Sequence, residues 1–447
     1  MNISKTFQRF CHKIHLYSTN DFDTSIKEIT KKLNRTYYDS DSDSEHIHIV
    51  GSIGRGTAVN GVSDVDIIFD LPPNVYSKFD AYSTNGQSAL LQEIKEVILE
   101  RYPNTAMRGD GLVVFIEFNK YTIELVPGFL QSDRSFKYPD TEDGGSWKKT
   151  DPFPEQEASR EKSKETDDNF THMCNMLRAW KNNIGLVFGG LLIDTLVFNF
   201  FDKYPSYISA DFSKYYDFLK DMFYFLSKEN PDQQYWFALG SNQHVDNTGH
   251  GAFVRKAKKA YSKLNEATSD EQIESGLEDL LGHSFSDSIK NSTEHLVAFS
   301  DRGVVSSHVH NAPNEQFIED IFPVDIRYSL VIDCKVTQKG FRPFLLSSML
   351  PHKWLSKNKS LVFSIASTTV QGQYDIYWKV RNRGIEAIKR NDERGEIILG
   401  KNEHRENTLF NGNHYVECYL VQNGVCIARA HIDVPINISY DDSEHRI

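Results

Sequence analysis

The sequence predicts an α+β protein with a mixed core, a helical lobe and a C-terminal β-sandwich-like domain. Strand-like and helix-like segments alternate up to about residue 170, helical periodicity dominates to about 291, and short alternating strands follow from 316. At 447 residues the chain is longer than one core usually supports. The expected divisions are a core at 1–170, a helical lobe at 171–291, a linker at 292–315, a β-rich domain at 316–438 and a tail at 439–447.

The predicted core opens with a helical segment at 4–38, followed by an acidic loop. A strand at 46–50 then leads into a sharp turn at Gly51–Ser52, and a second strand runs over 64–69. Glycine permits such a turn, and a helix that starts there offers unpaired N–H groups to a phosphate.

The second part of the core contains a helix at 87–102 and two β-rich runs at 112–118 and 121–126. The two residues between these runs, Asn119 and Lys120, indicate a hairpin. A long polar connection over 131–170 follows, in which 155–169 reads as a solvated helix start.

The helical lobe includes the most apolar stretch of the chain, 184–201. It carries Asp194 and Asn199, which favours a buried helix over a membrane span. No signal peptide is evident, and the five cysteines are scattered without a CxxC pair. We therefore expect a soluble, cytoplasmic protein with reduced thiols and no membrane partner.

The charge balance limits the partners of the protein. There are 50 basic and 62 acidic residues, which give a formal net charge of −12. A protein whose main task is to bind duplex DNA needs a basic surface, so no strong duplex binding is expected. A small basic pocket for nucleoside triphosphates remains compatible with this charge.

The residues that point to chemistry lie between 51 and 126. Asp64 and Asp66 are two positions apart on a predicted strand, so their carboxylates share one face. Glu124 alternates with two apolar residues on a later strand and is the preferred third carboxylate, with Glu117 as its competitor. Such a set suits Mg²⁺, with Mn²⁺ as an alternative, because hard cations prefer oxygen ligands. Two ions in such a site activate an attacking hydroxyl and stabilise leaving pyrophosphate.

The order of these motifs resembles the polymerase-β-like nucleotidyltransferases, and within them the cGAS/DncV-like group, the bacterial CD-NTases of antiphage signalling. The resemblance covers about 10–290. It rests on Gly51–Ser52, Gly56–Thr57, Ser63–Asp66 and Glu124–Pro127, with support from Trp147–Pro152 and Arg178–Lys181. In one respect the chain departs from the family, which commonly has Asp at the position of Glu124.

The resemblance implies roles for individual residues. Asp64, Asp66 and Glu124 would be the catalytic and metal-binding carboxylates. The Gly51 backbone and Ser52 would bind the triphosphate, and Arg178 or the nearby Lys181 would contact phosphates. The alternative is that these two cations are polar positions on an amphipathic helix, and function is favoured for at least one of them. Arg55 is a further nucleotide-binding candidate because it follows Ser52 by three residues, but it could equally be an exposed loop arginine.

Residues 316–438 resemble the AGS-C domain, a nucleotide-sensor module found with such enzymes. The matching positions are Tyr377–Val380, Asn382, Gly384, Gly395, Arg405–Glu406, Thr408, Gly412, His414 and Cys418. An unknown activating ligand is expected at this domain. Core packing is expected for Trp180 and for one residue of the pair Tyr377–Trp378, and a structural hydrogen-bonding role for His414.

The leading functional hypothesis is a nucleotidyltransferase that condenses nucleoside triphosphates into a cyclic or linear oligonucleotide second messenger. In CBASS-type antiphage signalling, such a product would act on a downstream effector. Two alternatives stay open: a nucleotidyltransferase that modifies tRNA or protein, and a nucleotide-binding sensor without turnover.

Overall fold

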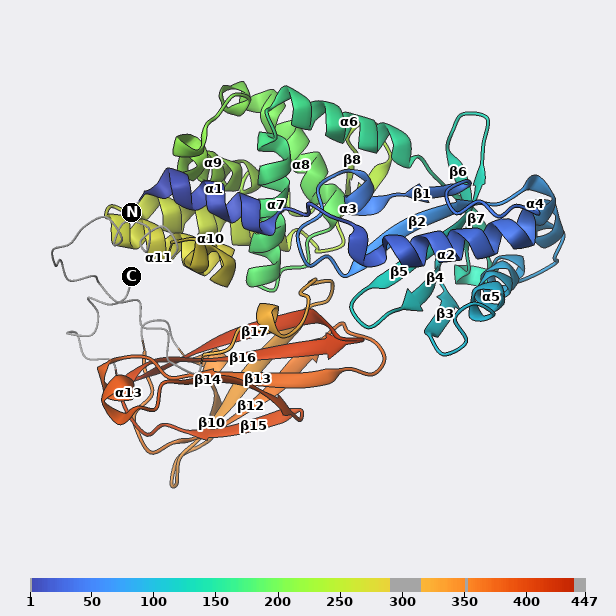
Figure 1. The fold of residues 1–447 in the computed structure, drawn as a ribbon. Helices are drawn as coiled ribbons and strands as arrows, with labels where there is room; N and C mark the ends of the chain where they lie inside the picture. Colours follow the sequence, from blue (N-terminus) through green and yellow to red (C-terminus); the bar gives the residue numbers. More distant parts are fainter. Residues whose placement is uncertain (1, 290–314, 350–352, 438–447) are drawn as a thin grey trace. The chain divides into compact units, whose positions relative to one another are not determined.

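The computed structural model describes residues 2–289, 315–349 and 353–437 (Figure 1). Contacts within the chain divide it into two compact units. One comprises Cys11–Arg178 and Gly189–Val254, and the other comprises Met1–Phe10, Ala179–Phe188 and Arg255–Ile447. The division falls inside helix α7 (Asn169–Asn183). Each unit has a hydrophobic core of its own.

A seven-stranded sheet organises the unit that contains the predicted site. Its strands are β1 (Ile47–Ile49), β2 (Asp64–Asp70), β3 (Ala106–Asp110), β4 (Val113–Glu117), β5 (Thr122–Leu130), β6 (Phe136–Asp140) and β7 (Ser146–Thr150). The order is β1-β2-β5-β4-β3, and β6 joins β5 to β7. β2 and β5 are parallel, whereas β4 and β5 form the antiparallel hairpin that the sequence predicts.

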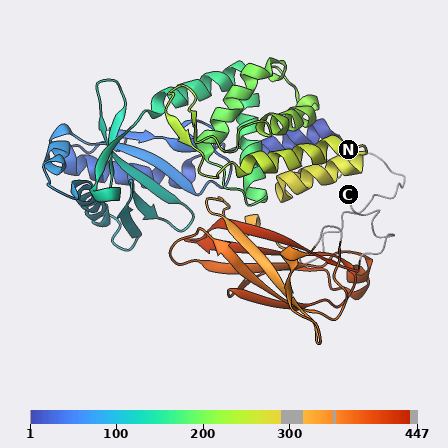
Figure 2. The same cartoon turned by 180° about the vertical axis from the view of Figure 1, so that it is seen from behind.

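Three helices cover one face of this sheet: α2 (Asn20–Tyr37), α4 (Pro73–Asp80) and α5 (Gly86–Leu99). Alternation along β2 and β5 sends Val65, Ile67, Ile123 and Leu125 to that face, where all four are fully buried. Figure 1 shows α2 in front of the strands, and Figure 2 shows the same strands from behind. The opposite face is left for the polar residues of the two strands.

Two expectations for this unit are wrong in detail. The single helix over 4–38 is two helices, α1 (Ile3–Ile14) and α2, because His15 forms a β-bridge with Val59. The segment 131–170 is not one long connection, because it holds β6, β7 and helix α6 (Pro152–Glu165). Phe136 anchors β6 in a small cluster with Val50 and Ile68. One apolar anchor gives no periodicity in the sequence, so the strand could not be recognised.

The helical region continues with α7 and α8 (Gly190–Lys203), the 3₁₀ turns Pro205–Tyr207 and Phe212–Lys214, and α9 (Tyr215–Leu226). A short hairpin of β8 (Tyr235–Phe237) and β9 (His244–Asp246) precedes α10 (Ala252–Glu266) and α11 (Asp270–Leu281). The apolar stretch is confirmed as a largely buried helix, α8. Within the described parts of the chain, every helix is too short or too polar to cross a bilayer. All five cysteines are buried and free.

The C-terminal region consists of two four-stranded antiparallel sheets, which confirms the predicted sandwich-like architecture. One has the order β11-β10-β12-β15 and the other β14-β13-β16-β17. The strands are β10 (Leu330–Thr337), β11 (Phe344–Leu345), β12 (Ser360–Thr368), β13 (Asp375–Arg381), β14 (Arg394–Gly400), β15 (Glu403–Asn407), β16 (Gly412–Gln422) and β17 (Val425–Ile436). A short helix, α13 (Ile385–Arg390), and the 3₁₀ turns Ile318–Asp320 and Leu346–Ser348 complete it.

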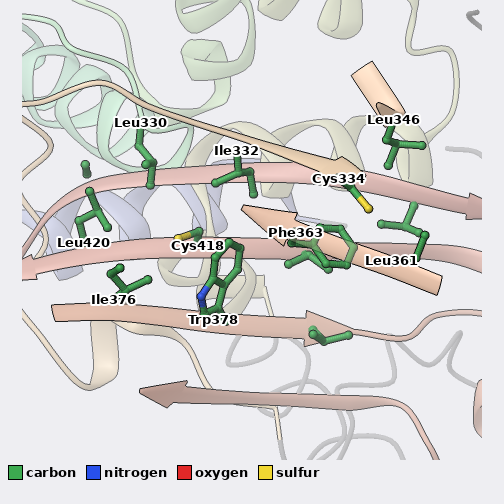
Figure 3. Close-up of a cluster of buried hydrophobic side chains, with 14 of the residues drawn as sticks. Leu330, Ile332, Cys334, Leu346, Leu361, Phe363, Ile376, Trp378, Cys418 and Leu420 are labelled. Atoms are coloured by element: carbon green, nitrogen blue, oxygen red, sulfur yellow. The ribbon is translucent and has the colours of Figure 1, made fainter. Parts of the chain in front are cut away.

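The core of this region lies between the two sheets (Figure 3). Trp378 is fully buried there, as expected, and its indole N–H donates to the Lys401 carbonyl oxygen at 2.9 Å. His414 accepts from the Arg383 N–H at 3.1 Å, so its structural role is confirmed. The predicted linker 292–315, except for Glu315, and the predicted tail lie outside the described residues.

Candidate active site

The parallel pairing of β2 and β5 places the predicted carboxylates on one sheet face. Asp66 is directly opposite Glu124, and Asp64 is opposite Thr122. Directly paired residues point to the same side, and so do residues two positions apart on one strand. All three carboxylate residues are partly exposed, whereas the residues between them are buried in the core. The fold therefore brings Asp64, Asp66 and Glu124 together.

The register also separates Glu124 from its competitor. Glu117 pairs with Thr122, so it lies on the same face but one strand farther from Asp64. Its carboxylate is 3.8 Å from the guanidinium of Arg108. Neighbouring strands are ~4.8 Å apart, so Glu124 is the nearer partner for the two aspartates.

Gly51 lies directly against the carboxylate of Asp66. Its φ of +61° belongs to the left-handed region, which favours glycine. A Cβ at this position would be 1.8 Å from the Asp66 Oδ2 atom, which no side chain could tolerate. The backbone holds the same contact, because the Val50 N–H donates to the Asp66 carbonyl oxygen at 2.9 Å. The turn and the carboxylate thus form one structural element.

Ser52 lies in the single helical turn α3 (Gly51–Gly54) and is partly exposed. The Thr57 N–H donates to the Ser52 carbonyl oxygen at 2.9 Å, which closes the loop after α3. Ser159 donates its hydroxyl to the Arg55 carbonyl oxygen at 2.6 Å. The predicted phosphate-binding turn is therefore held at both ends by hydrogen bonds.

A buried carboxylate on α8 holds the side chains of this turn. Asp194 accepts from Arg55 Nε at 2.9 Å and from the Thr57 hydroxyl at 2.8 Å. It also accepts from both terminal nitrogens of Arg178, at 2.6 and 3.0 Å. We call Arg55, Thr57, Arg178 and Asp194 the Asp194 cluster. Burial raises the pKa of Asp194, but the two guanidinium groups more than offset it and keep the pKa below the ordinary value.

The three predicted phosphate-binding cations therefore have protein partners. Arg178 also donates to the carbonyl oxygens of Cys174 and Gly190. Lys181 belongs to the other unit, where its ammonium group contacts Asp325 and the Ile326 carbonyl oxygen, both at 3.0 Å. The structure brings Arg55 and Arg178 together with Gly51 and Ser52 through the Asp194 cluster, and gives Lys181 a different environment.

Asp194 is the site residue that the sequence reasoning missed as a functional group. It counted only as evidence against a membrane span. A lone acidic residue in the apolar run LLIDTLVFNFF signals a buried carboxylate that needs a charged partner. Its partners are 16 and 139 positions away in sequence, so only the fold identifies them.

The donor set at the carboxylate row fits a hard divalent cation. Asp64, Asp66 and Glu124 offer only oxygen ligands from adjacent positions of one sheet face. Across the described ranges, no three His, Cys, Asp or Glu side chains already form a closed metal-binding group. The backbone positions of these three residues thus suit a cation.

Two protein families match this chain. Residues 1–163 match the Second Messenger Oligonucleotide or Dinucleotide Synthetase (SMODS) domain, and residues 312–437 match the Adenylyl/Guanylyl and SMODS C-terminal sensor domain, AGS-C. A curated relative, a probable cyclic nucleotide synthase of Bacillus cereus (strain VD146), is 21% identical over 183 residues. This match covers 38% of the chain and 55% of the relative, so the chain spans about half of that protein's length.

Two solved structures are more distantly similar. The E. coli MS115-1 protein CdnC, solved with ATP, has a TM-score of 0.48 and 17% identity, over 63% of this chain and 98% of that chain. A mutant of the Vibrio cholerae di-nucleotide cyclase (DncV) has a TM-score of 0.49 and 11% identity, over 64% of this chain and 97% of that chain.

Proposed function

We infer that this chain belongs to the CD-NTase-like nucleotidyltransferases, with a SMODS domain and a C-terminal AGS-C domain. On this premise we propose that it condenses nucleoside triphosphates into a cyclic or linear oligonucleotide second messenger. The observation that carries the proposal is the carboxylate row of Asp64, Asp66 and Glu124 beside the Gly51 turn. A ribose oxygen forms the new bond to the α-phosphorus. The bond between the α-phosphorus and the oxygen that bridges it to the β-phosphorus breaks. Pyrophosphate leaves with the electron pair of this bond, and the hydroxyl proton passes to solvent.

The residues of the row would hold Mg²⁺ or Mn²⁺. When bound there, such a cation supplies Lewis acidity, which lowers the pKa of the attacking hydroxyl and stabilises the leaving pyrophosphate. Gly51 and Ser52 bind the triphosphate through backbone N–H groups and the serine hydroxyl. The contact between Gly51 and Asp66 fixes the phosphate-binding turn relative to one metal ligand.

The contacts with Asp194 favour positioning roles for Arg55 and Arg178. Both guanidinium groups are bound to Asp194, and their side chains are only 8% and 6% exposed, so little of either is accessible to a phosphate. Together with Thr57 they hold the residues that follow α3. For Lys181 the contact with Asp325 favours a role in the unit that contains the sensor domain.

The test is incubation of the purified chain with the four nucleoside triphosphates, each labelled in turn at the α-phosphorus, with Mg²⁺ and separately with Mn²⁺. We expect a phosphatase-resistant small product that is absent for D64N/D66N. D70N is the matched control, because Asp70 lies on the same strand and its carboxylate accepts the Leu130 N–H at 2.9 Å. Label on added RNA or protein, or nucleotide binding without turnover, would refute the proposal.

We further propose that the product acts in CBASS-type defence by binding a downstream effector. The support is the matched pair of synthetase and sensor domains. Cells that express the wild-type chain with its neighbouring genes should reduce phage plating, and cells with the D64N/D66N chain should not. Equal protection by both chains would contradict this role while leaving the enzymatic proposal intact.

A further inference from the structure

The outer face of the second sheet of the sensor domain carries two buried cations. Alternation along β13 sends Trp378 and Val380 into the core, and sends Lys379 and Arg381 to the opposite face. The two cations are nevertheless only 2% and 5% exposed. Lysine and arginine are rarely buried so completely unless they bind a negative charge. This face therefore contains a built anion position.

A single carboxylate occupies that position. Glu315 Oε1 is 3.0 Å from Lys379 Nζ, and Glu315 Oε2 is 3.1 Å from Arg381 Nε. The Tyr415 hydroxyl donates to Glu315 Oε1 at 3.4 Å. The nearest oxygens of the next carboxylates, Glu417 and Glu393, are each 3.8 Å from one of the cations. Glu315 is thus the close anionic partner of both cations.

Glu315 does not belong to either sheet. It begins the described segment 315–326, which we call the strap. The strap starts against the edge strand β14 and ends at β17, where Val324 forms a β-bridge with Cys426. The Gln316 N–H donates to the Gly395 carbonyl oxygen at 3.0 Å, and Gln316 Oε1 accepts from the Ile397 N–H at 2.8 Å. A side chain at Gly395 would come within 3.0 Å of the Glu315 Cα atom. Next to Glu315 the strap is held by the Gln316 hydrogen bonds, and farther along Ile318 and Ile326 anchor it in a buried cluster.

We propose that Lys379, Arg381 and Tyr415 form a binding site for the phosphate group of a signalling ligand, and that Glu315 is a built-in occupant which this ligand displaces. Two full cations and a hydroxyl converge on this one carboxylate, and the Glu417 and Glu393 oxygens lie farther away, each 3.8 Å from one cation. A phosphate brings up to two charges and three acceptor oxygens, and both lysine and arginine bind it well.

The Phe317 ring lies 4.6 Å from Lys379 Nζ, so the strap also covers the cation with an aromatic face. Displacement of Glu315 would expose the cation and release the Gln316 contacts to β14 together. In the wild-type chain Glu315 competes with the ligand, so the apparent affinity is reduced by the fraction of molecules in which it is bound. Removal of Glu315 is expected to increase the affinity at least tenfold.

The experiment uses the full chain and inorganic pyrophosphate as the probe, at constant ionic strength set with sodium chloride. Hydrogen exchange is followed at two places: the strap with β14, and residues 51–57. In the wild-type chain the Gln316 and Ile397 amides should exchange faster as pyrophosphate is added. A change in hydrogen exchange at 51–57 alone reports pyrophosphate binding at the proposed active site and not at Lys379 and Arg381. The experiment can therefore contradict either proposal without contradicting the other.

Three variants make the test specific. E315A should bind pyrophosphate at least tenfold more tightly than wild type, and the added anion should restore the thermal stability that the variant loses. K379M in the E315A chain should abolish this binding. The matched control is E319A on the same strap, because Glu319 pairs with Arg429 at 2.9 Å and touches neither Lys379 nor Arg381. E315Q replaces E315A if the latter does not fold.

Three results would overturn the proposal. Pyrophosphate that binds E315A no more tightly than E319A would show that Glu315 is a fixed structural partner. Binding that survives K379M would place the anion elsewhere. Malonate that binds E315A as tightly as pyrophosphate would show that the position recognises a carboxylate and not a phosphate.

Discussion

Two clusters of buried charge, one in each compact unit, are arranged in opposite ways. In the Asp194 cluster one carboxylate is central, and Arg55 and Arg178 surround it. In the sensor domain two cations on one strand, Lys379 and Arg381, enclose the carboxylate of Glu315. Both satisfy the rule that buried charge must be paired.

The difference lies in what carries the central anion. Asp194 is in the middle of a regular buried helix, so it can leave only if the packing of α8 is broken. Glu315 is at the start of the strap, outside both sheets and next to the two Gln316 hydrogen bonds, whereas the buried anchors of the strap, Ile318 and Ile326, come later. The first cluster is therefore suited to fix a geometry, and the second to exchange its anion with one from solution.

The largest expected effect concerns the carboxylate row beside the turn that the Asp194 cluster holds. E124Q should lower the condensation rate about 100-fold or more, because loss of one proposed cation ligand would remove several kcal/mol of transition-state stabilisation. E117Q, on the neighbouring strand and the same face, should change the rate less than about threefold. Initial rates with saturating triphosphates measure both. If E124Q and E117Q lower the rate equally, the strand register does not identify Glu124 as the third catalytic carboxylate.

The next effect separates steric contact from backbone strain in the turn. G51A should reduce activity about 100-fold, because the added Cβ must move the Asp66 carboxylate by about an ångström. G56A is the control in the same loop: its φ is +71°, but a Cβ there meets no atom within 4 Å. If both variants lose activity equally, backbone strain and not the contact with Asp66 is the cause.

D194N tests whether the first cluster is a fixed one. Removal of the charge leaves two buried guanidinium groups without their anion, so the unfolding free energy should fall by about 3–5 kcal/mol. D202N, on the same helix but 67% exposed, should change it by less than about 0.5 kcal/mol. Because the folded-state pKa of Asp194 is depressed, its contribution is present above the ordinary pKa of 3.8 and is lost as the pH falls further.

The fall in unfolding free energy is measured by chemical denaturation, with hydrogen exchange of the β2 and α8 amides as the readout. Unlike E315A, the D194N chain should not be rescued by added pyrophosphate. Rescue of D194N would remove the distinction between the two clusters.

The smallest expected effect is a pH dependence of the sensor domain. Burial lowers the pKa of His431, but Asp433 and Glu417 more than offset this and raise it to about 9. The resulting stability is complete below the ordinary pKa of 6.5 and is lost as the pH rises through 9. The effect should be modest, because 47% of the side chain is exposed and solvent screens the charges. Exchange of the β16 and β17 amides should accelerate over this range in wild type, and H431Q should abolish the slope.

The sequence was sufficient wherever one periodicity carried the information. Alternation around Asp64, Asp66 and Glu124 predicted their common face, and the parallel register of β2 and β5 agrees with it. Alternation also predicted five of the eight sandwich strands. Three edge strands were missed. Charged and glycine residues interrupt the apolar pattern of β14 and β15, and β11 has only two residues.

The partners of buried charges could not be predicted. Arg178 and Lys181 read alike on one helix, yet one binds Asp194 and the other Asp325. Nothing in a local pattern distinguishes a cation that faces a ligand from one that faces a distant carboxylate. The partner of Lys379 likewise does not follow from alternation along the strand, and only the fold shows that it is Glu315.

The contact between Gly51 and Asp66 has a consequence for how such chains can diverge. Because the carboxylate lies where a side chain at 51 would be, the two positions are expected to change together or not at all. A relative that gains a side chain at this glycine must lose bulk at the aspartate, and with it a proposed metal ligand. The glycine alone would then distinguish an active synthetase from a descendant that has kept the fold and lost the reaction.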